Sequence, residues 1–134
     1  MASTYNFKAL SILLVDDAKP MADLLGSILK ELGVGKITVH TEAKKSMDLL
    51  DSVATVQTQG TPAIDIVISD WRMEPISGLE LLKWIRNHNS DGIRFMPFIM
   101  LTAYSDHGRV MAARDAGANE VLAKPVSVLN PNYS

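Results

Sequence analysis

Short apolar runs alternate with segments of helical period along the chain, and this alternation constrains the fold more than any other feature of the sequence. Four runs are rich in apolar and β-branched residues, which is typical of strands buried on both faces of a sheet. They span residues 10–15, 64–69, 98–101 and 120–123, and residues 36–40 form a weaker fifth run. The segments between these runs predict helices, so strands and helices alternate through five strands.

The first predicted helix follows Pro20 and ends before Gly33, with apolar residues at three- and four-residue spacing between them. Three more helices are expected from about Thr41, a candidate N-cap, through Val53, from Gly78 through Ile85, and over about residues 107–115. Residues 57–62 and 88–92 look like surface loops. Strict alternation predicts a doubly wound parallel α/β sheet with helices on both faces, in which ligands bind at the carboxyl ends of the strands.

Composition limits the function classes. A chain of 134 residues suits one domain, and its 47% hydrophobic content with 21% charged residues argues against intrinsic disorder. A net charge of −2 offers no broad attraction to nucleic acid or to anionic lipid. The absence of cysteine excludes disulfides, a thiolate nucleophile and Cys-ligated zinc, and it fits a reducing compartment, so we expect a cytoplasmic protein. No apolar run approaches the roughly 20 residues that a membrane-spanning helix requires.

Polar residues end four of the predicted strands. These residues are Asp16 and Asp17 after the first strand, Asp70 after the third, Thr102 after the fourth, and Lys124, followed by Pro125, after the fifth. All of them face one edge of the sheet, where three carboxylates repel one another unless a cation compensates. A hard divalent cation such as Mg²⁺ favours these oxygen ligands. Lys124 and the Thr102 hydroxyl are suited to two oxygens of a transferring phosphoryl group.

Each residue taken alone has a simpler explanation. An aspartate directly after a strand is often a turn former or a helix N-cap, and the same holds for Asp16 with Asp17 and for Asp70. Thr102 alone favours a structural role, and Lys124 with Pro125 could be an ordinary entry to a loop. Coincidence is a poor explanation of the joint pattern, because acidic, hydroxyl and basic groups all fall at the correct ends of four strands.

The same residues lie in motifs that resemble the receiver domains of two-component response regulators, especially the stand-alone chemotaxis type. The resemblance covers residues 11–125. Its motifs are Ile12-Leu13-Leu14-Val15-Asp16-Asp17, Ile68-Ser69-Asp70-Trp71-Arg72-Met73 leading to Gly78-Leu79-Glu80-Leu81-Leu82, Met100-Leu101-Thr102-Ala103, and Ala116-Gly117-Ala118 leading to Lys124-Pro125. We therefore expect one receiver domain over residues 1–134, with its core over about 9–125, a tail over 126–134 and the flavodoxin-like strand order 2-1-3-4-5.

The resemblance implies a role for each matched residue. Asp70 would accept a phosphoryl group from the phosphohistidine of a histidine kinase or a phosphotransfer protein, and Thr102 and Lys124 would bind the phosphoryl oxygens. Asp16, Asp17 and Asp70, with the backbone carbonyl of Arg72, would hold Mg²⁺, for which Mn²⁺ could substitute. A cis peptide is implied before Pro125. Such a protein catalyses only its own phosphorylation and dephosphorylation, and is otherwise not an enzyme.

The chain departs from the family pattern at three places. The resemblance implies that Arg72 and Tyr104 occupy positions that tune access of water to the phosphoryl group, and because both are large we expect slower dephosphorylation than in relatives with small residues there. Val121 stands where receivers usually carry a switching aromatic residue, so the switch is muted or moved, with Tyr104 the nearest candidate. Only nine residues follow Pro125, and Pro131 interrupts them. The fifth helix is therefore expected to be missing or truncated. Either the sequence stops before the natural end of the protein, or apolar sheet surface is left for a partner, such as a second copy, to cover.

Each of three other functions is disfavoured by the sequence. A haloacid dehalogenase-type phosphatase usually carries a second aspartate two residues after its nucleophile, where this chain has Ala18 and Arg72. A receiver-like scaffold that never accepts phosphate is disfavoured because every required side chain is present. A dinucleotide-binding domain lacks support because no glycine-rich turn follows the first strand.

Overall fold

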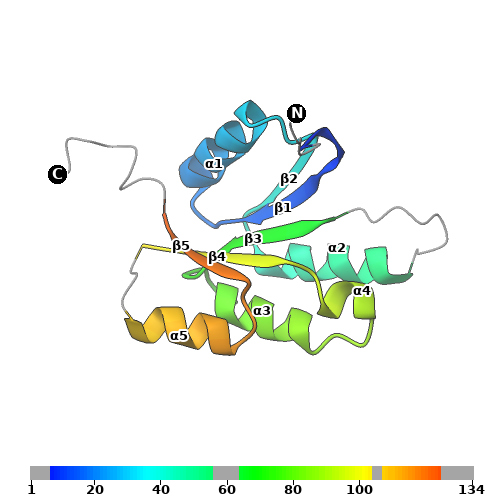
Figure 1. Cartoon of the computed structure of the whole chain (residues 1–134), viewed down its shortest axis with the longest axis vertical. Coiled ribbons are helices and arrows are strands. Elements are labelled where there is room, and N and C mark those ends of the chain that lie inside the picture. The colour runs from blue at the N-terminus through cyan, green and yellow to red at the C-terminus, as the bar shows by residue number, and fades with distance from the viewer. Residues whose placement is uncertain (1–6, 56–63, 104–106, 125–134) are drawn as a thin grey trace, which may run out of the picture.

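The computed structural model describes residues 7–55, 64–103 and 107–124, which form a parallel five-stranded sheet with helices on both faces (Figure 1). The sheet order is β2-β1-β3-β4-β5, and all four ladders are parallel. The strands are β1 (Ser11–Val15), β2 (Lys36–His40), β3 (Ile66–Asp70), β4 (Phe98–Thr102) and β5 (Glu120–Ala123). This topology confirms the predicted doubly wound fold and the order 2-1-3-4-5.

The helices divide unequally between the two faces. They are a 3₁₀ turn (Phe7–Ala9), α1 (Lys19–Glu31), α2 (Ala43–Thr55), α3 (Gly78–Arg86), α4 (Asp91–Arg94) and α5 (His107–Asp115). In the described part of the chain, α1 covers one face of the sheet, whereas α2, α3, α4 and α5 lie on the other (Figure 1). The short α4 corrects the end of the loop expected at residues 88–92, of which residues 88–90 are outside any helix or strand, because four residues are too few to show a helical period.

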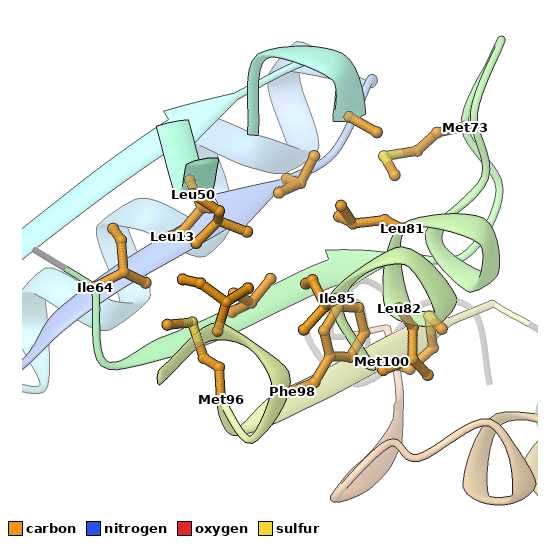
Figure 2. Close-up of a cluster of buried hydrophobic side chains, with 14 of the residues drawn as sticks. Leu13, Leu50, Ile64, Met73, Leu81, Leu82, Ile85, Met96, Phe98 and Met100 are labelled. Atoms are coloured by element: carbon orange, nitrogen blue, oxygen red, sulfur yellow. The ribbon is translucent and has the colours of Figure 1, made fainter. Parts of the chain in front are cut away.

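Side chains that alternate along the strands build two cores, because successive residues of a strand point to opposite faces. Leu13 and Val15 belong to the larger core, which α2 and α3 cover and which Figure 2 shows from close by. Leu14, between them, belongs to a smaller core with Leu25 of α1 and Leu101 of β4. Burying each such side chain contributes about 1.5–3 kcal/mol, so the central strands are firmly held.

The strand boundaries and the outer strands differ from expectation. β1 begins one residue later than expected, and β3 runs from Ile66 to Asp70 instead of over residues 64–69. Ile64 is still buried, but it lies before the strand. The prediction that β5 is buried on both faces was wrong, because β5 is an edge strand and Leu122 is 49% exposed. An apolar run predicts a strand without telling whether that strand has neighbours on both sides.

Several expectations fall outside the described residues. Tyr104, Pro125 with its peptide bond, and the tail over residues 126–134 are among them, so the missing or truncated fifth helix stays a prediction. No helix in the described part of the chain is long and apolar enough to cross a membrane.

Candidate functional site: an acidic crevice at the carboxyl edge of the sheet

The strands end in register, which brings the predicted site residues to one edge. Backbone hydrogen bonds continue the ladders just past the strands, from Asp16 N–H to the His40 carbonyl (3.0 Å) and from Lys124 N–H to the Thr102 carbonyl (2.9 Å). β1 and β3 are adjacent at the point where the strand order reverses. In doubly wound sheets this reversal opens a crevice at the carboxyl ends of the strands, so Asp16 and Asp70 flank the place where such folds bind ligands.

Three carboxylates meet at this edge. Asp16, Asp17 and Asp70 each offer an oxygen, and these oxygens all lie within 4.8 Å of one another. Asp16 and Asp70 are 0% and 4% exposed, whereas Asp17 is exposed. The site therefore has two buried carboxylates at its base and a third at its mouth.

Lys124 reaches the cluster from the end of β5. Its Nζ lies 3.2 Å from Asp70 Oδ2 and 3.7 Å from Asp16 Oδ2. The first distance is that of a charged hydrogen bond, whereas the second is an ion pair too long for a hydrogen bond. One ammonium group thus lies against two of the three carboxylates, so the cluster carries excess negative charge when all three are ionised.

Burial and mutual repulsion disfavour ionisation of the buried acids. Burial raises the pKa of Asp16, and the Asp17 charge raises it further, while the hydrogen bond from Ala18 N–H (2.9 Å) and the Lys124 charge lower it. Burial also raises the pKa of Asp70, and the Asp16 charge adds to that rise against the opposing effect of Lys124. The cluster is therefore electrostatically unfavourable when all its carboxylates are charged.

The donor set fits a hard divalent cation. Among the described residues, Oδ2 of Asp16 is buried and has no hydrogen-bond partner, which is costly for a carboxylate oxygen. A cation bound among Asp16, Asp17 and Asp70 would satisfy that oxygen and cancel the excess charge. Oxygen ligands with one exposed side are the environment that Mg²⁺ prefers, since it keeps several waters. The backbone carbonyl of Arg72, in the loop after Asp70, stays a predicted fourth ligand.

The other predicted residues take different positions. Thr102, at the end of β4, is 1% exposed and lies next along the chain to Leu101, the residue paired with Asp70. Val121 is half-buried, pairs with Met100 in the ladder and packs against the larger core. Arg72 is exposed. The structure therefore brings Asp16, Asp17, Asp70 and Lys124 together, with Thr102 at the neighbouring end of β4, and places Val121 half-buried against the larger core.

The close approach of α3 to β3 was not foreseen from the sequence. A Cβ at Gly78 would lie 2.1 Å from the Asp70 carbonyl oxygen, so a larger residue here would collide with the backbone of Asp70. Gly78 N–H donates to the Trp71 carbonyl (2.8 Å), and Ser77 caps the helix by accepting from Glu80 N–H. The Ser-x-x-Glu spacing is a recognisable capping box, but the need for Gly78 appears only when helix and strand are packed.

The fold and the site define a doubly wound α/β protein with an acidic, cation-compatible crevice at its topological switch point. A family model described as "Response regulator receiver domain" matches residues 12–130. The chain belongs to this family of receiver domains, as the resemblance predicted.

Individual relatives agree with this assignment. The chain is 27% identical over 118 residues to the chemotaxis protein CheY-3 of Vibrio cholerae, covering 88% of this chain and 82% of that protein. It is 28% identical over 116 residues to the chemotaxis protein CheY1 of Helicobacter pylori, covering 87% and 86%. The receiver domain of the Arabidopsis thaliana histidine kinase CKI1, solved with Mg²⁺ and BeF3⁻, shares the fold with a TM-score of 0.80 at 23% identity, covering 92% and 86%.

Proposed function

We propose that the chain is a phosphorylation-controlled binding module in which Asp70 accepts a phosphoryl group from a phosphohistidine. The donor would be a histidine kinase or a phosphotransfer protein, and the reaction would depend on Mg²⁺. One observation carries the proposal: Asp16, Asp17 and Asp70 converge within 4.8 Å, and Lys124 lies 3.2 Å from Asp70. The protein acts on its own phosphoryl group and has no metabolic substrate.

The chemistry follows from the positions of these side chains. A carboxylate oxygen of Asp70 attacks the phosphorus, an O–P bond forms, and the P–N bond to the donor imidazole breaks with its electron pair staying on nitrogen. Lys124 donates to one phosphoryl oxygen and the Thr102 hydroxyl to another, which offsets the charge that gathers there. When bound to Asp16, Asp17, Asp70 and the Arg72 carbonyl, Mg²⁺ supplies further positive charge at those oxygens.

An Asp70→Asn variant tests the acceptor directly. Wild-type protein incubated with acetyl phosphate and Mg²⁺ should gain the mass of one phosphoryl group, while the variant should gain none because an amide is not a comparable nucleophile. Asp23→Asn is a matched control, since Asp23 is exposed and pairs with Lys19 on the surface of α1. Labelling of Asp70→Asn at the wild-type level would refute the assignment, and addition of EDTA should abolish labelling of the wild type.

Two alternative functions predict different results in related experiments. A receiver-like scaffold would bind neither a phosphoryl group nor beryllium fluoride, which mimics it. A phosphatase of the haloacid dehalogenase type would turn over many equivalents of a phosphate monoester, which a protein that phosphorylates only itself does not do. Both alternatives are less well supported, because the donor set is complete and position 72 is an arginine.

Arg72 is proposed to slow hydrolysis of the phosphorylated state. Its long side chain follows the acceptor by two residues and is exposed, so it can shield the phosphoryl group from water. We expect Arg72→Ala to lose its phosphoryl group a few times faster than wild type in a phosphate-release time course. A matching time course would remove Arg72 from this role. Tyr104 is proposed to act with it.

Output is proposed to occur by partner binding in the cytoplasm, with chemotaxis as one candidate pathway because two relatives are chemotaxis proteins. Val121 has no ring to rotate and is packed against the core, so the signal is carried by another group. A second copy is a candidate partner for the face that carries α1, where Leu122 of β5 is 49% exposed. Elution as a monomer at every concentration in size-exclusion chromatography would contradict homodimerisation.

A further inference from the structure

The loop between α3 and α4 carries a group of side chains that the proposed function does not use. It borders a cleft of about 420 Å³ lined by Asp51, Ala54, Thr55, His88, Asn89 and Ser90. We propose that Asn89 is a site of spontaneous deamidation, in which the backbone nitrogen of Ser90 is the nucleophile and His88 is the general base. The reaction converts Asn89 to aspartate or isoaspartate, and it does not depend on phosphorylation of Asp70.

Hydrogen bonds hold the imidazole of His88 in one tautomer. The N–H of Ser90 donates to Nδ1 of His88 (3.0 Å), and because a backbone N–H is always a donor, this nitrogen carries no proton. The proton of the neutral ring is therefore on Nε2, which lies 2.8 Å from Oδ1 of Asp51. Only 11% of the His88 side chain is exposed, and its ring meets the Trp84 ring edge to face with the centroids 5.1 Å apart. A basic nitrogen is thus fixed against the amide of Ser90.

This geometry matches what deamidation of an asparagine requires. The backbone nitrogen of the following residue must lose its proton before it can attack the side-chain carbonyl carbon, and a base within hydrogen-bond reach of that proton accelerates the step. In this loop the N–H that must be deprotonated is that of Ser90, which already donates to His88. Asp51 accepts from the other ring nitrogen and offsets the positive charge that forms on the ring when it takes the proton.

A second asparagine two residues earlier lacks this arrangement. Asn89 is exposed and lies outside any helix or strand, so its side chain can turn toward the next nitrogen. The side-chain amide of Asn87 instead donates to the Lys83 carbonyl (2.8 Å), and the N–H of His88 donates to the Ile85 carbonyl (3.1 Å). A carbonyl oxygen is too weak a base to take an amide proton. The structure therefore favours reaction at Asn89 over Asn87.

The reaction proceeds through a cyclic imide and balances as follows. The Ser90 nitrogen bonds to Cγ of Asn89 while its proton passes to Nδ1 of His88. The C–N bond of the side-chain amide then breaks, its electron pair stays on the departing nitrogen, and the proton from His88 completes a molecule of ammonia. Water opens the imide at one of its two carbonyls, which gives aspartate or isoaspartate. Water is the only co-reactant, and the cleft exposes the site to it.

The product changes the start of α4. The Ser90 carbonyl accepts from the N–H groups of Ile93 (3.1 Å) and Arg94 (2.8 Å), so this residue begins the helix. Isoaspartate adds a methylene group to the main chain directly before it, and either product places a new carboxylate in the cleft that Asp51 lines. The Arg94 carbonyl also accepts from Arg86 of α3 (2.9 Å). We therefore expect the deamidated protein to have a lower melting temperature than the fresh protein.

Ageing the folded protein at constant pH and temperature, followed by peptide mapping, tests the site. Trypsin cleaves after Arg86 and Arg94 and releases the peptide 87–94, which contains both Asn87 and Asn89. This peptide should gain the mass difference between an amide and an acid, and fragmentation should place the change at Asn89, with Asn87 intact as the internal control. Isomerisation at Asp91 leaves the mass unchanged, so it does not imitate the result.

Two variants separate general-base catalysis from looseness of the loop. We expect His88→Gln to slow deamidation of Asn89 about 100-fold, the low end for a positioned general base. Asp51→Asn should slow it about tenfold, the scale of one hydrogen bond to a charged group. Asp48→Asn, which removes an exposed carboxylate one turn earlier on α2, should leave the rate unchanged. A loop that is merely loosened reacts faster, so slowing identifies the base.

Asp51 acts through His88 and is a positioning residue, so the state of the ring is measured directly. Nitrogen chemical shifts from NMR should show Nδ1 of His88 without a proton and Nε2 with one, and Asp51→Asn should move the Nε2–H signal. A proton on Nδ1, an intact Asn89, equal reaction at Asn87 and Asn89, or equal rates in wild type and His88→Gln would each overturn the proposal. None of these outcomes bears on whether Asp70 accepts a phosphoryl group.

Discussion

Two regions of this molecule bury charge in opposite ways. At the end of α3, the half-buried guanidinium of Arg86 is surrounded by acceptors: it donates to the carbonyls of Gly117 (3.0 Å), Arg94 (2.9 Å) and Met96 (2.8 Å), and to Asn119 Oδ1 (3.1 Å). At the carboxyl edge of the sheet, the carboxylates of Asp16 and Asp70 are buried beside one lysine, and among the described residues Oδ2 of Asp16 has no hydrogen-bond partner. The first charge is satisfied by its own chain, and the second is not.

The difference indicates that the Arg86 network has a structural role, whereas the acidic crevice is a binding site. Arg86 joins α3 to the segment between α4 and β4 and to the turn before β5, and burial lowers its pKa without neutralising it. Within the described residues no carboxylate pairs with it, because oriented carbonyl dipoles already supply the compensation. In the acidic crevice, Lys124 and the Ala18 N–H compensate the carboxylates only in part, so the cluster stores an unfavourable interaction that a cation can relieve. A charged cluster left incomplete is therefore the better indicator of a binding site.

The largest expected effect on stability is loss of the Arg86 network. Arg86→Met keeps much of the apolar volume but leaves three carbonyls without their donor, so we expect a loss of about 3 kcal/mol in the free energy of unfolding. Urea denaturation followed by circular dichroism measures it. The free energy of unfolding of Arg86→Lys should lie between those of wild type and Arg86→Met, since an ammonium group supplies fewer donors in a different geometry. If Arg86→Met lowers the free energy of unfolding no more than a substitution of an exposed residue does, the Arg86 network contributes little to stability.

Removing a buried charge from the acidic crevice should stabilise the metal-free protein, whereas removing the charge of Arg86 destabilises it. Because the pKa of Asp16 and that of Asp70 are raised in the folded protein, it binds more protons than the unfolded chain between pH 3.8 and the raised values. Without a divalent cation, stability should therefore fall as pH rises through this window. At pH 7, Asp16→Asn should stabilise the metal-free protein by about 1–2 kcal/mol, because it removes a buried charge.

The same variant tests the cation site. Added Mg²⁺ should stabilise wild-type protein in thermal denaturation, since it binds the folded state alone, and should stabilise Asp16→Asn much less. A stabilisation by Mg²⁺ that is equal in both proteins would place the cation away from Asp16. If metal-free Asp16→Asn is less stable than metal-free wild type, the charge of Asp16 does not destabilise the folded protein.

The smallest expected effect concerns a third way of burying a titratable group. His40 ends β2, its Nδ1 is 2.9 Å from the hydroxyl of the buried Ser46, and burial and then the charge of Lys45 lower its pKa. A lowered histidine pKa contributes stability above pH 6.5 that is lost as pH falls below it, because the unfolded chain then binds more protons. The loss should stay under about 1 kcal/mol, since the ring is partly exposed. His40→Gln should flatten the pH profile between pH 7 and 5 by that amount, and an unchanged profile would contradict the assignment.

The site could be predicted because its residues lie at the ends of parallel strands. Asp16, Asp70 and Lys124 are far apart in sequence, but parallel topology brings the carboxyl ends of all strands to one edge, so the convergence follows once the strands are recognised. The Arg86 network could not be predicted in this way. Its four acceptors are mainly backbone carbonyls, which carry no residue-specific signal and come together only when α3, α4 and the turn at Gly117 pack.

The sequence by itself determined the order of the strands and of the longer helices, the parallel sheet, and which polar side chains share an edge, because these depend on local periodicity and on chirality rules. The tertiary structure alone decided that Asp16 is buried while Asp17 is exposed, that β5 lies at an open edge, and that Asp51 of α2 contacts His88. Burial and contact between distant residues depend on how whole elements pack against one another, and no local pattern in the chain records that packing.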